Sequence, residues 1–481
     1  MKDVQKVEIG HEPIYDVSVL SLPKQWLLSI QHVLSMSGST VLVPILIASY
    51  FVAAGLDAPT KGLTVSTTLL GAGIGTLILH VITWLAGHEV PVFLGSSFAF
   101  LGGFATVASL DTGIYAAMDA NTKAAYACGG IVAAGLLYVV VAVIIKLVGT
   151  ERVMRVFPPV VTGPVIACIG LTLAPSAISN AKQNWVLALV AIFVMVAFQQ
   201  WGKGMLKIVP ILMGFVISYI VALVMHWCGF TNADGSAILN FATVSEAKIF
   251  GVPPMQLPKF DPNIVLIMAS PAIASMMEHV GDVSAVSSTT RKNYLEHPGL
   301  WLTLLCDGSA TAFAALFGSP ANTTYGENTG TLTLTRVYDP KVIRRAAYIT
   351  VFISFFPWLS AAIATMPSAI VGGISFMLYG MISVVGFRNI KENNVNLDNP
   401  RNVIIIAVEM VCGLGLTDGL PLSIFGTTVT LTGLAIAPIA GIALNLLLPK
   451  KEDEYGAEDH SSNSGVNFDI SPKGGKIKAD H

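Results

Sequence analysis

Five acidic side chains interrupt stretches of sequence that are otherwise apolar, and these residues are the best suited to do chemistry. They are Glu278, Asp282, Asp307, Glu327 and Glu409. A charged side chain at the centre of a bilayer is costly, so acids inside a membrane span are candidate functional groups. Glu278 and Asp282 are four residues apart and share one helix face. Because no Lys or Arg falls inside a predicted span, one of these two acids is expected to hold a proton, which suits proton coupling.

Two segments of the chain are rich in Gly, Ser, Thr and Asn. They read VFLGSSFAFLGGF, around residues 90–108, and FGSPANTTYGENTG, around residues 318–335. Non-helical backbone is stable at membrane depth only where it is buried in protein or lines a wet cavity. Its free N–H and C=O groups can bind a small polar molecule there, and helix N-termini add further donors. The alternative, two glycine-rich packing helices, does not explain the Tyr, Glu and Asn residues. For Asp307 and Glu409 the alternative is a hydrogen bond to a broken helix.

The composition places these residues in a membrane protein. Of the 481 residues, 53% are hydrophobic and 12% are charged, and the mean hydropathy is +0.70. Soluble domains carry about 25% charged residues, so a cytoplasmic enzyme is excluded. The net charge of −2 argues against nucleic acid as a partner. There is no HExxH, nucleophile elbow or Walker A loop, so we expect no enzyme, no cofactor and no metal site.

The hydropathy pattern predicts an all-α polytopic protein with 14 transmembrane segments, since one helix needs about 20 apolar residues to cross. Long spans are expected at 25–51, 62–86, 124–145, 184–201, 208–228, 262–284, 346–366, 402–417 and 428–448. Shorter or broken spans are expected at 90–108, 157–178, 299–317, 318–335 and 368–386.

The basic residues predict the orientation of these spans. With the N-terminus inside, 22 of the 27 Lys and Arg residues lie in cytoplasmic segments. The five outside are Lys61, Lys123, Lys182, Lys248 and Lys259. By the positive-inside rule, both ends of the chain are expected in the cytoplasm.

Three local echoes divide the chain into two repeats. QHV at 31–33 resembles EHV at 278–280, LGSS at 94–97 resembles FGSP at 317–320, and FPPVVTGP at 157–164 resembles MPSAIVGG at 366–373. Seven spans is an odd number, so the second repeat must enter the membrane inverted. Inverted repeats with broken helices are typical of secondary transporters, which bind substrate near the midplane. The predicted domains are a cytoplasmic N-terminus (1–24), a first repeat (25–229), an extracellular or periplasmic loop (230–261), a second repeat (262–449) and a disordered cytoplasmic tail (450–481).

Several motifs resemble the nucleobase–ascorbate transporter family, also called the nucleobase:cation symporters. ENTGTLTLTR at 327–336 fits the family signature of an acid or amide, Asn, any residue, Gly, four free positions, Thr and a basic or small residue. Gln31 and His32 resemble its Gln-His pair in span 1. ASMMEHVGD at 274–282 resembles its acidic motif in span 8, and CDG at 306–308 the acid in span 9. Within the family, the motifs are most similar to those of bacterial uracil permeases, which implies a location in the plasma (bacterial inner) membrane.

The resemblance implies core and gate domains, short strands in segments 3 and 10, and a homodimer. It implies that Phe98 lies beside the substrate ring and that Glu278 is the substrate ligand and main coupling acid. Glu327 would be the second acidic ligand, with Tyr325 and the Gly326 backbone beside it. Supporting residues would be Gln31, His32, Asp307 and Asn328, and Asp282 would join Glu278 in proton coupling.

These expectations favour import of uracil by proton symport, with alternating access to a site between segments 3, 8 and 10. A xanthine or urate symporter stays open, because acids at 282 and 307 are common among purine-type members. Those members usually carry Gln where this chain has Glu327, which favours uracil. An anion exchanger or channel is disfavoured by Glu278 and Glu327. The expected partners are the small-molecule substrate and the lipid bilayer, and the coupling ion could be H⁺ or Na⁺.

Overall fold

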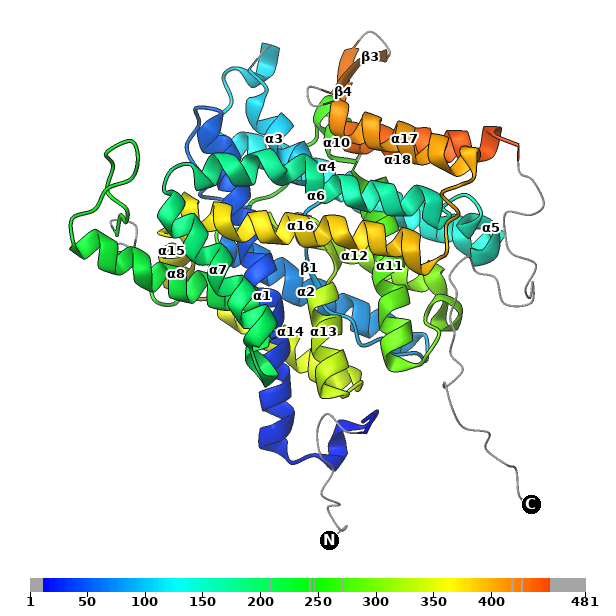
Figure 1. The fold of residues 1–481 in the computed structure, drawn as a ribbon, viewed down its shortest axis with the longest axis horizontal. Coiled ribbons are helices and arrows are strands. Elements are labelled where there is room, and N and C mark those ends of the chain that lie inside the picture. Colours follow the sequence, from blue (N-terminus) through cyan, green and yellow to red (C-terminus); the bar gives the residue numbers. More distant parts are fainter. Residues whose placement is uncertain are drawn as a thin grey trace.

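The structure is a computed structural model that describes residues 12–449, except 112, 208, 242–243, 246, 270, 417–418 and 425–426. It is mostly helical (Figure 1). The predicted disordered tail at 450–481 lies outside the described residues, as do residues 1–11 of the predicted cytoplasmic N-terminus.

The first half of the chain begins with a 3₁₀ turn, η1 (Val17–Val19), and ends at the membrane helix α8. Its main elements are α1 (Leu22–Ala53), α2 (Val65–Leu85), β1 (Leu94–Ser96), α3 (Leu101–Ser109), α4 (Ala120–Val148), α5 (Thr150–Met154), α6 (Pro159–Ala181), α7 (Trp185–Trp201) and α8 (Pro210–Trp227). Two further 3₁₀ turns are η2 (Gly113–Tyr115) and η3 (Gly204–Lys207).

The second half begins with α10 and α11, which together correspond to the span predicted at 262–284. Its first elements, in chain order, are α10 (Pro262–Ala269), α11 (Ala272–Thr290), the π-helical turn η4 (Leu295–Gly299), α12 (Leu300–Ala315), β2 (Asn322–Thr324), α13 (Gly326–Thr335) and α14 (Pro340–Ser354). The chain continues with α15 (Pro357–Ala364), α16 (Ser368–Glu392), α17 (Pro400–Gly415), β3 (Leu420–Ile424), β4 (Thr427–Leu431) and α18 (Gly433–Leu447).

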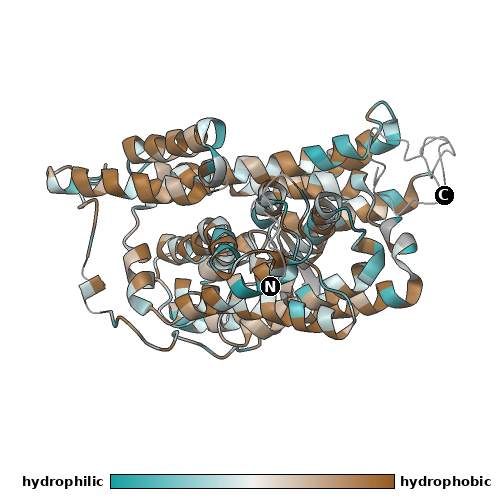
Figure 2. Cartoon of the chain, turned by 90° about the horizontal axis from the view of Figure 1, so that it is seen from below, coloured by the Kyte–Doolittle hydropathy of each residue, from teal (hydrophilic) through white to brown (hydrophobic). Residues whose placement is uncertain are grey.

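Seven of the described spans are long and apolar enough to cross a membrane, and the bent pair α14–α15 makes an eighth. The helices are coloured mostly as hydrophobic in Figure 2. α7 and α18 are apolar but shorter, and segments 3 and 10 are each a short strand followed by a short helix. The structure therefore supports a multi-pass membrane protein, and the count of 14 crossings stays a prediction.

Two predicted spans differ from the structure. The span expected at 346–366 begins at Pro340 and bends by 81° between α14 and α15. Pro357 starts the second helix, and its missing N–H cannot continue the hydrogen-bond ladder of the first. The helix expected at 428–448 begins only at Gly433, because residues 427–431 pair with β3 as an antiparallel hairpin. The run TTVTL is rich in β-branched residues, which favour strands, so the start of the helix predicted at 428–448 is wrong.

The helices pack as two groups. In one group α4 packs against α10 and α12, and α2 against α12 and α14. In the other group α6 packs against α16 and α17, which lie side by side with it in Figure 1, and α7 packs against α8. Small residues allow the close approach of α6 and α16: a Cβ added to Gly163 would lie 3.0 Å from the carbonyl oxygen of Gly386. Contacts of α11 with α6, and of α1 with α8 and α16, join the two groups.

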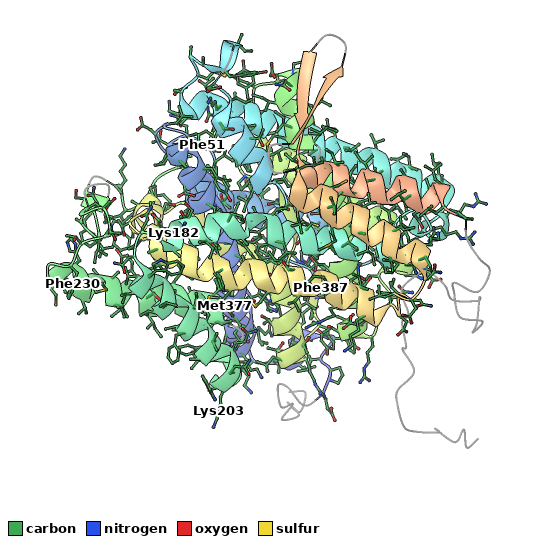
Figure 3. All side chains as sticks on the ribbon, turned by 45° about the horizontal axis from the view of Figure 1, so that its top comes forward. Phe51, Lys182, Lys203, Phe230, Met377 and Phe387 are labelled. Carbon is green, nitrogen blue, oxygen red and sulfur yellow. The ribbon has the colours of Figure 1, made fainter. Side chains whose placement is uncertain are left out.

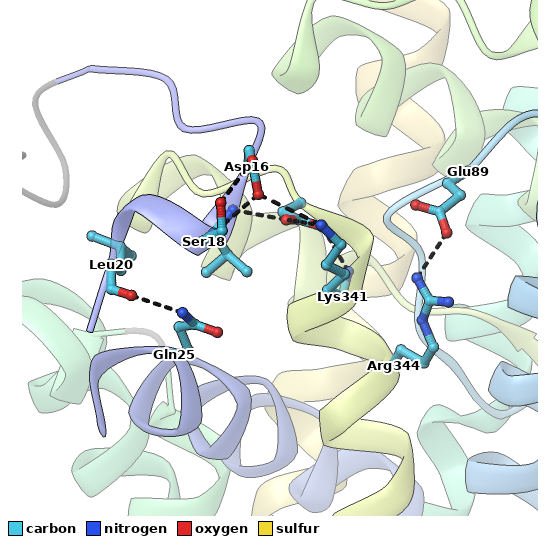
Figure 4. A network of polar contacts seen from close by, with 9 residues as sticks. Asp16, Ser18, Leu20, Gln25, Glu89, Lys341 and Arg344 are labelled. Carbon is cyan, nitrogen blue, oxygen red and sulfur yellow. Dashed lines mark hydrogen bonds and ion pairs between the residues drawn. The ribbon is translucent and has the colours of Figure 1, made fainter. Parts of the chain in front are cut away.

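The N-terminal segment, residues 12–21, is fastened to the loop between α13 and α14. Ile14 forms a parallel bridge with Val337, and the N–H of Val17 donates to Asp339 Oδ2 at 2.7 Å. Figure 4 shows the polar side of this contact, where Lys341 lies 3.5 Å from Asp16 Oδ1. Apolar side chains seal its other side: Ile14, Val17, Leu20, Leu28, Val337 and Val342. The segment therefore belongs to the folded body of the protein.

Basic residues stand near both ends of α7, and the predicted orientation puts them on opposite sides of the membrane. Lys182 precedes α7 and is predicted outside, whereas Lys203 follows α7 and is predicted inside. Figure 3 shows the two lysines at the two ends of this helix. The long loop at 230–261 contacts the residue after Lys182, where the N–H of Ala233 donates to the carbonyl of Gln183 at 3.0 Å. Near its end, the Lys259 N–H donates to the carbonyl of Ala125 in α4 at 2.9 Å.

Candidate functional site

The two broken segments meet at the centre of the fold as a two-stranded antiparallel sheet. β1 pairs with β2 in the register Leu94 to Thr324, Gly95 to Thr323 and Ser96 to Asn322. The pairing extends by one bond at each end, from Ser97 N to Ala321 O at 2.8 Å and from Tyr325 N to Phe93 O at 3.0 Å. The short strands expected in segments 3 and 10 are therefore present. They bring together two stretches that are more than 200 residues apart in sequence.

The first turn of α13 presents backbone donors to an open space. α13 begins at Gly326, directly after Tyr325, and Gly326 is exposed although its neighbours at 321–325 are buried. A Cβ added to Gly326 would lie 3.6 Å from Asp282 Oδ1, so an acid of α11 faces this helix end. The first N–H groups of a helix have no partner within it and attract electron-rich groups. This turn can therefore donate to a carbonyl oxygen of a bound molecule.

α1 holds the acid and the amide of that turn from the opposite side. The Ser39 hydroxyl donates to Glu327 Oε1, and the Ser35 hydroxyl donates to the Glu327 carbonyl at 2.9 Å. Asn328 Nδ2 lies 3.1 Å from His32 Nδ1 and 3.2 Å from the His32 carbonyl. Because a carbonyl can only accept, the Asn328 amide is the donor, and His32 Nδ1 accepts as well. The predicted pair of His32 and Asn328 therefore links α1 to α13.

α11 contributes the acids expected to bind substrate and protons. Glu278 and Asp282 are both partly buried on this helix, one turn apart. Glu278 Oε2 is buried and has no hydrogen-bond partner in the described part of the chain. The Glu278 carboxyl is close enough to those of Glu327 and Asp307 to interact with them electrostatically. An acceptor left free in this way can bind an N–H group of a ligand.

Asp307 lies on α12, is fully buried, and interacts electrostatically with Glu278 of α11. Its Oδ2 is 3.2 Å from Nδ1 of His279, the residue that follows Glu278. His279 was not among the predicted site residues, although it stands in one of the sequence echoes. Its other ring nitrogen, Nε2, is 3.1 Å from the Thr303 hydroxyl. The Asp307 carboxyl therefore lies beside the ring of His279, and neither of its oxygens has a hydrogen-bond partner among the described residues.

Two aromatic residues close the site in different ways. Phe98 follows β1, is 5% exposed, and its ring centroid lies 6.4 Å from that of Tyr379 on α16, edge to face. The hydroxyl of Tyr325 donates to the Ser96 carbonyl at 3.0 Å, and its ring covers Gly95. Phe98 thus joins the two helix groups, whereas Tyr325 fastens β2 to β1.

The structure brings the predicted residues of α1, α11, α13 and the strands together around one place. Gln31 is partly buried, and its Oε1 has no hydrogen-bond partner among the described residues. Glu409 lies elsewhere, on α17, where its carboxyl packs against Gly441 of α18. Ser35, Ser39 and His279 were missed. The spacing of the two serines, four apart and one turn after the Gln-His pair, was the available signal.

Among the described residues, no group of three or more His, Cys, Asp or Glu side chains could hold a metal ion. The site consists of carboxyl groups, hydroxyls and free backbone N–H groups within a bundle of apolar spans. Such a set can bind and release a neutral polar molecule and protons. A site of this kind within apolar spans is typical of a membrane transporter.

Comparison with known proteins identifies the family of transporters to which the chain belongs. Residues 23–422 match the model of the xanthine and uracil permeases, described as the Permease family. A probable uracil permease of Pasteurella multocida is 37% identical over 439 residues, covering 89% of this chain and 95% of that protein. The uracil permease of Bacillus subtilis is 34% identical and covers 95% of this chain and 99% of that protein. The chain belongs to this permease family, that of the nucleobase–ascorbate transporters, and is not an enzyme.

Solved structures share the fold at low sequence identity. The transmembrane domain of the cyanobacterium bicarbonate transporter BicA aligns with a TM-score of 0.54 and 17% identity, covering 86% of this chain and 97% of that chain. A murine solute carrier 26 family anion transporter in the inward-facing state aligns with a TM-score of 0.54 and 10% identity, covering 89% of this chain and 68% of that chain. At these identities the likeness concerns the fold alone.

Proposed function

We propose that this protein imports uracil across the bacterial inner membrane by proton symport. The observation that carries the proposal is the free, buried Oε2 of Glu278, which lies among acids at the point where the two broken segments meet. The curated relatives at 34–37% identity over most of the chain are named uracil permeases, which supports uracil as the substrate.

Uracil suits this site chemically. It is a flat, neutral ring with two N–H donors and two carbonyl acceptors. In our proposal the carboxyl oxygens of Glu278 and Glu327 accept from the N–H groups, while the backbone N–H groups of the first turn of α13 donate to a carbonyl. Phe98 would lie against the ring. A base with another donor pattern leaves one of these buried groups unpaired, which costs about 1–3 kcal/mol for each group.

Proton coupling would reside on Glu278, with Asp282 as its partner. Both acids lie on one face of α11, and a second charge on that face is unfavourable away from water. Protonation of Glu278 would therefore accompany uracil on the inward step. In this proposal the coupling ion is H⁺, and replacement of Na⁺ by another cation in the assay buffer leaves transport unchanged.

Movement of the two helix groups against each other would give alternating access. The group of α1–α4 and α10–α14 carries the acids and strands, so it corresponds to the proposed core domain. The group of α6–α8 and α16–α18 would form the gate domain, which meets the core at Phe98 and Tyr379. This proposal includes 14 crossings in two inverted repeats with both ends cytoplasmic. The homodimer stays a prediction, which the mass of the detergent-solubilised protein would test.

A purine base is the second candidate, favoured by the placement of Asp282 and Asp307 at the site. Competition of labelled-uracil uptake by thymine, xanthine, hypoxanthine and urate separates the two functions. We expect unlabelled uracil to compete most strongly. Stronger competition by xanthine or urate would replace uracil by a purine as the substrate. Conductance that follows voltage without any base would instead indicate an anion channel.

A matched pair of variants tests the role of Glu278. Glu278→Gln removes the site acid, and Glu409→Gln removes another buried acid that lies outside the site. We expect Glu278→Gln to abolish uptake driven by a pH gradient and Glu409→Gln to retain it. Equal loss in both variants would mean that the effect comes from burying an amide rather than from the site.

A further inference from the structure

The central two-stranded sheet has two outer edges that need hydrogen-bond partners. The bonds that extend the sheet join residues 93 and 97 of the first segment to residues 325 and 321 of the second. Successive residues of a strand direct their backbone groups to opposite sides, so Leu94 and Asn322 direct theirs away from the partner strand. Both residues are buried. At membrane depth such backbone groups must be satisfied by other parts of the protein.

A threonine of α2 binds the outer edge of β1. The N–H of Leu94 donates to the Thr76 hydroxyl at 2.9 Å, and the Leu94 carbonyl lies 3.2 Å from the same hydroxyl. The hydroxyl has a single proton, and the Ala72 carbonyl of α2 is also within its reach at 2.8 Å. Whichever carbonyl receives that proton, the hydroxyl oxygen remains the acceptor for the Leu94 N–H. Thr76 has no exposed surface, so this contact is closed to water.

A threonine of α12 binds the outer edge of β2 in the same way. The N–H of Asn322 donates to the Thr311 hydroxyl at 3.2 Å, and this hydroxyl donates to the Asn322 carbonyl at 3.1 Å. Thr311 also has no exposed surface. The side chain of Asn322 adds a bond to the other helix, since its Nδ2 donates to the Gly71 carbonyl of α2 at 3.1 Å. The sheet is therefore held between α2 and α12.

The two threonine contacts are related by the symmetry of the sheet. The antiparallel register has a local two-fold axis at the pair of Gly95 and Thr323, and this axis relates Leu94 to Asn322. Along the chain, α2 directly precedes β1 and α12 directly precedes β2. The same type of side chain thus binds the same backbone groups at both symmetry-related places. This recurrence points to a common role in holding the sheet.

The position of the sheet determines where groups of the site lie. Phe98 stands two residues after the end of β1, and α13 begins at Gly326, two residues after the end of β2. Each strand has only three residues, so few bonds within the sheet resist a shift of one strand. The threonine contacts fasten both strands to longer helices. A strand that moved away from its helix would carry Phe98 or the first turn of α13 with it.

We propose that Thr76 and Thr311 are positioning residues, whose hydroxyls anchor the outer edges of β1 and β2 to α2 and α12 and thereby hold Phe98 and the first turn of α13 in place for substrate. Loss of either hydroxyl leaves a buried N–H without its acceptor, which the strand can relieve only by moving. The effect on uracil rests on the proposed function, whereas the anchoring of the strands does not.

Valine and serine variants test the role of the two hydroxyls. Valine has the shape of threonine without the hydroxyl, and serine keeps the hydroxyl. We expect Thr76→Val and Thr311→Val each to lower the affinity for labelled uracil about tenfold or more, and Thr76→Ser and Thr311→Ser to stay within about threefold of wild type. Valine variants that bind uracil as wild type does would overturn the proposal. Serine variants that lose about tenfold in affinity would overturn it as well, because they keep the proposed contact.

Thr83→Val is the matched control on α2. Thr83 has no exposed surface, and its hydroxyl donates within the helix, to the Leu79 carbonyl at 2.8 Å. Among the described residues it makes no hydrogen bond to either strand. We expect Thr83→Val to bind uracil within about twofold of wild type. A loss equal to that of Thr76→Val would overturn the proposal, because it would assign the effect to a buried valine in α2 rather than to the strand.

Amide hydrogen exchange of the purified proteins without uracil separates this proposal from the proposed function. Peptides that contain Leu94 should exchange at least about tenfold faster in Thr76→Val than in wild type, and peptides that contain Asn322 should do so in Thr311→Val. The serine variants and Thr83→Val should exchange as wild type does. Unchanged exchange of both strands in the valine variants would overturn the anchoring role. If wild-type protein does not bind uracil, the proposed function has failed, and the exchange rates still decide the anchoring.

Discussion

Ser39 gives the most specific prediction, because its hydroxyl donates directly to the Glu327 carboxyl from a different helix. Ser39→Ala deletes this donor and changes little else. Ser39 has no exposed surface, so water has no direct route to replace the lost hydroxyl. We expect the Glu327 carboxyl to lose its orientation, and uracil to bind more weakly.

The size of the effect follows from the kind of hydrogen bond. A buried hydrogen bond of which one partner is lost costs about 1–3 kcal/mol. If the whole cost appears in binding, the Kd for uracil rises by about 5- to 150-fold. Equilibrium binding of labelled uracil to the purified protein measures the change, and the unfolding temperature shows whether the variant is folded.

Ser37→Ala is the matched control for this measurement. Ser37 lies on the same helix, two residues from Ser39, and its hydroxyl donates to the carbonyl of Leu34 within the helix at 2.9 Å. Among the described residues, its hydroxyl makes no hydrogen bond to α13, so we expect the Kd of Ser37→Ala to stay within about twofold of wild type. Equal affinities of Ser39→Ala and wild type would refute the assignment of Glu327 as a ligand that α1 orients.

Two further substitutions test the sheet and the N-terminal segment. Gly95→Ala places a methyl group in the ring of Tyr325, so we expect uracil affinity to fall at least about tenfold in the binding assay. Asp339→Ala removes the acceptor of the Val17 N–H and the N-cap bond of 2.9 Å to Lys341 N, and should destabilise the protein by about 1–3 kcal/mol, measured by thermal unfolding.

Each of these has a control in the same element. A Cβ at Gly102 of α3 would meet no atom within 4 Å, so Gly102→Ala should bind uracil as wild type does. Asp16 of the N-terminal segment has a side chain that is 60% exposed, so Asp16→Ala should change stability by less than about 0.5 kcal/mol. Gly95→Ala with normal binding would contradict the close packing of Tyr325. An unfolding temperature of Asp339→Ala equal to that of Asp16→Ala would contradict the role of the segment.

Most helices could be predicted from the sequence because hydropathy acts locally. The spans predicted at 184–201 and 208–228 lie within two residues of α7 and α8 at each end. The strands in segments 3 and 10 could be expected only from the family resemblance, since three residues such as LGS or NTT carry no clear strand pattern alone.

The errors came from places where tertiary contacts override a local pattern. Hydropathy does not distinguish the β3–β4 hairpin from the start of a helix, because TTVTLT followed by apolar residues fits either structure. Pro357 marks the bend of 81° within the predicted span 11, but a proline alone does not give the direction or the size of a bend.

The candidate site was predictable in its acids and not in their partners. Glu278, Asp282, Asp307 and Glu327 stand out because a carboxyl in an apolar span is costly. Ser39 and Glu327 are 288 residues apart, and no spacing rule connects residues at that separation. His279 resembles an ordinary packing histidine until the fold places Asp307 against it. Contacts of this kind depend on how the two halves of the chain pack together.

Uptake of labelled uracil into proteoliposomes under an imposed pH gradient tests the central claim most directly. With the outside acidic, we predict accumulation of uracil above its external concentration, collapse of that accumulation by a protonophore, and no dependence on Na⁺. Glu278→Gln should not accumulate uracil, whereas Glu409→Gln should. Uptake by wild-type protein that ignores the proton gradient, or a Glu278→Gln protein that still accumulates uracil, would contradict proton symport through Glu278.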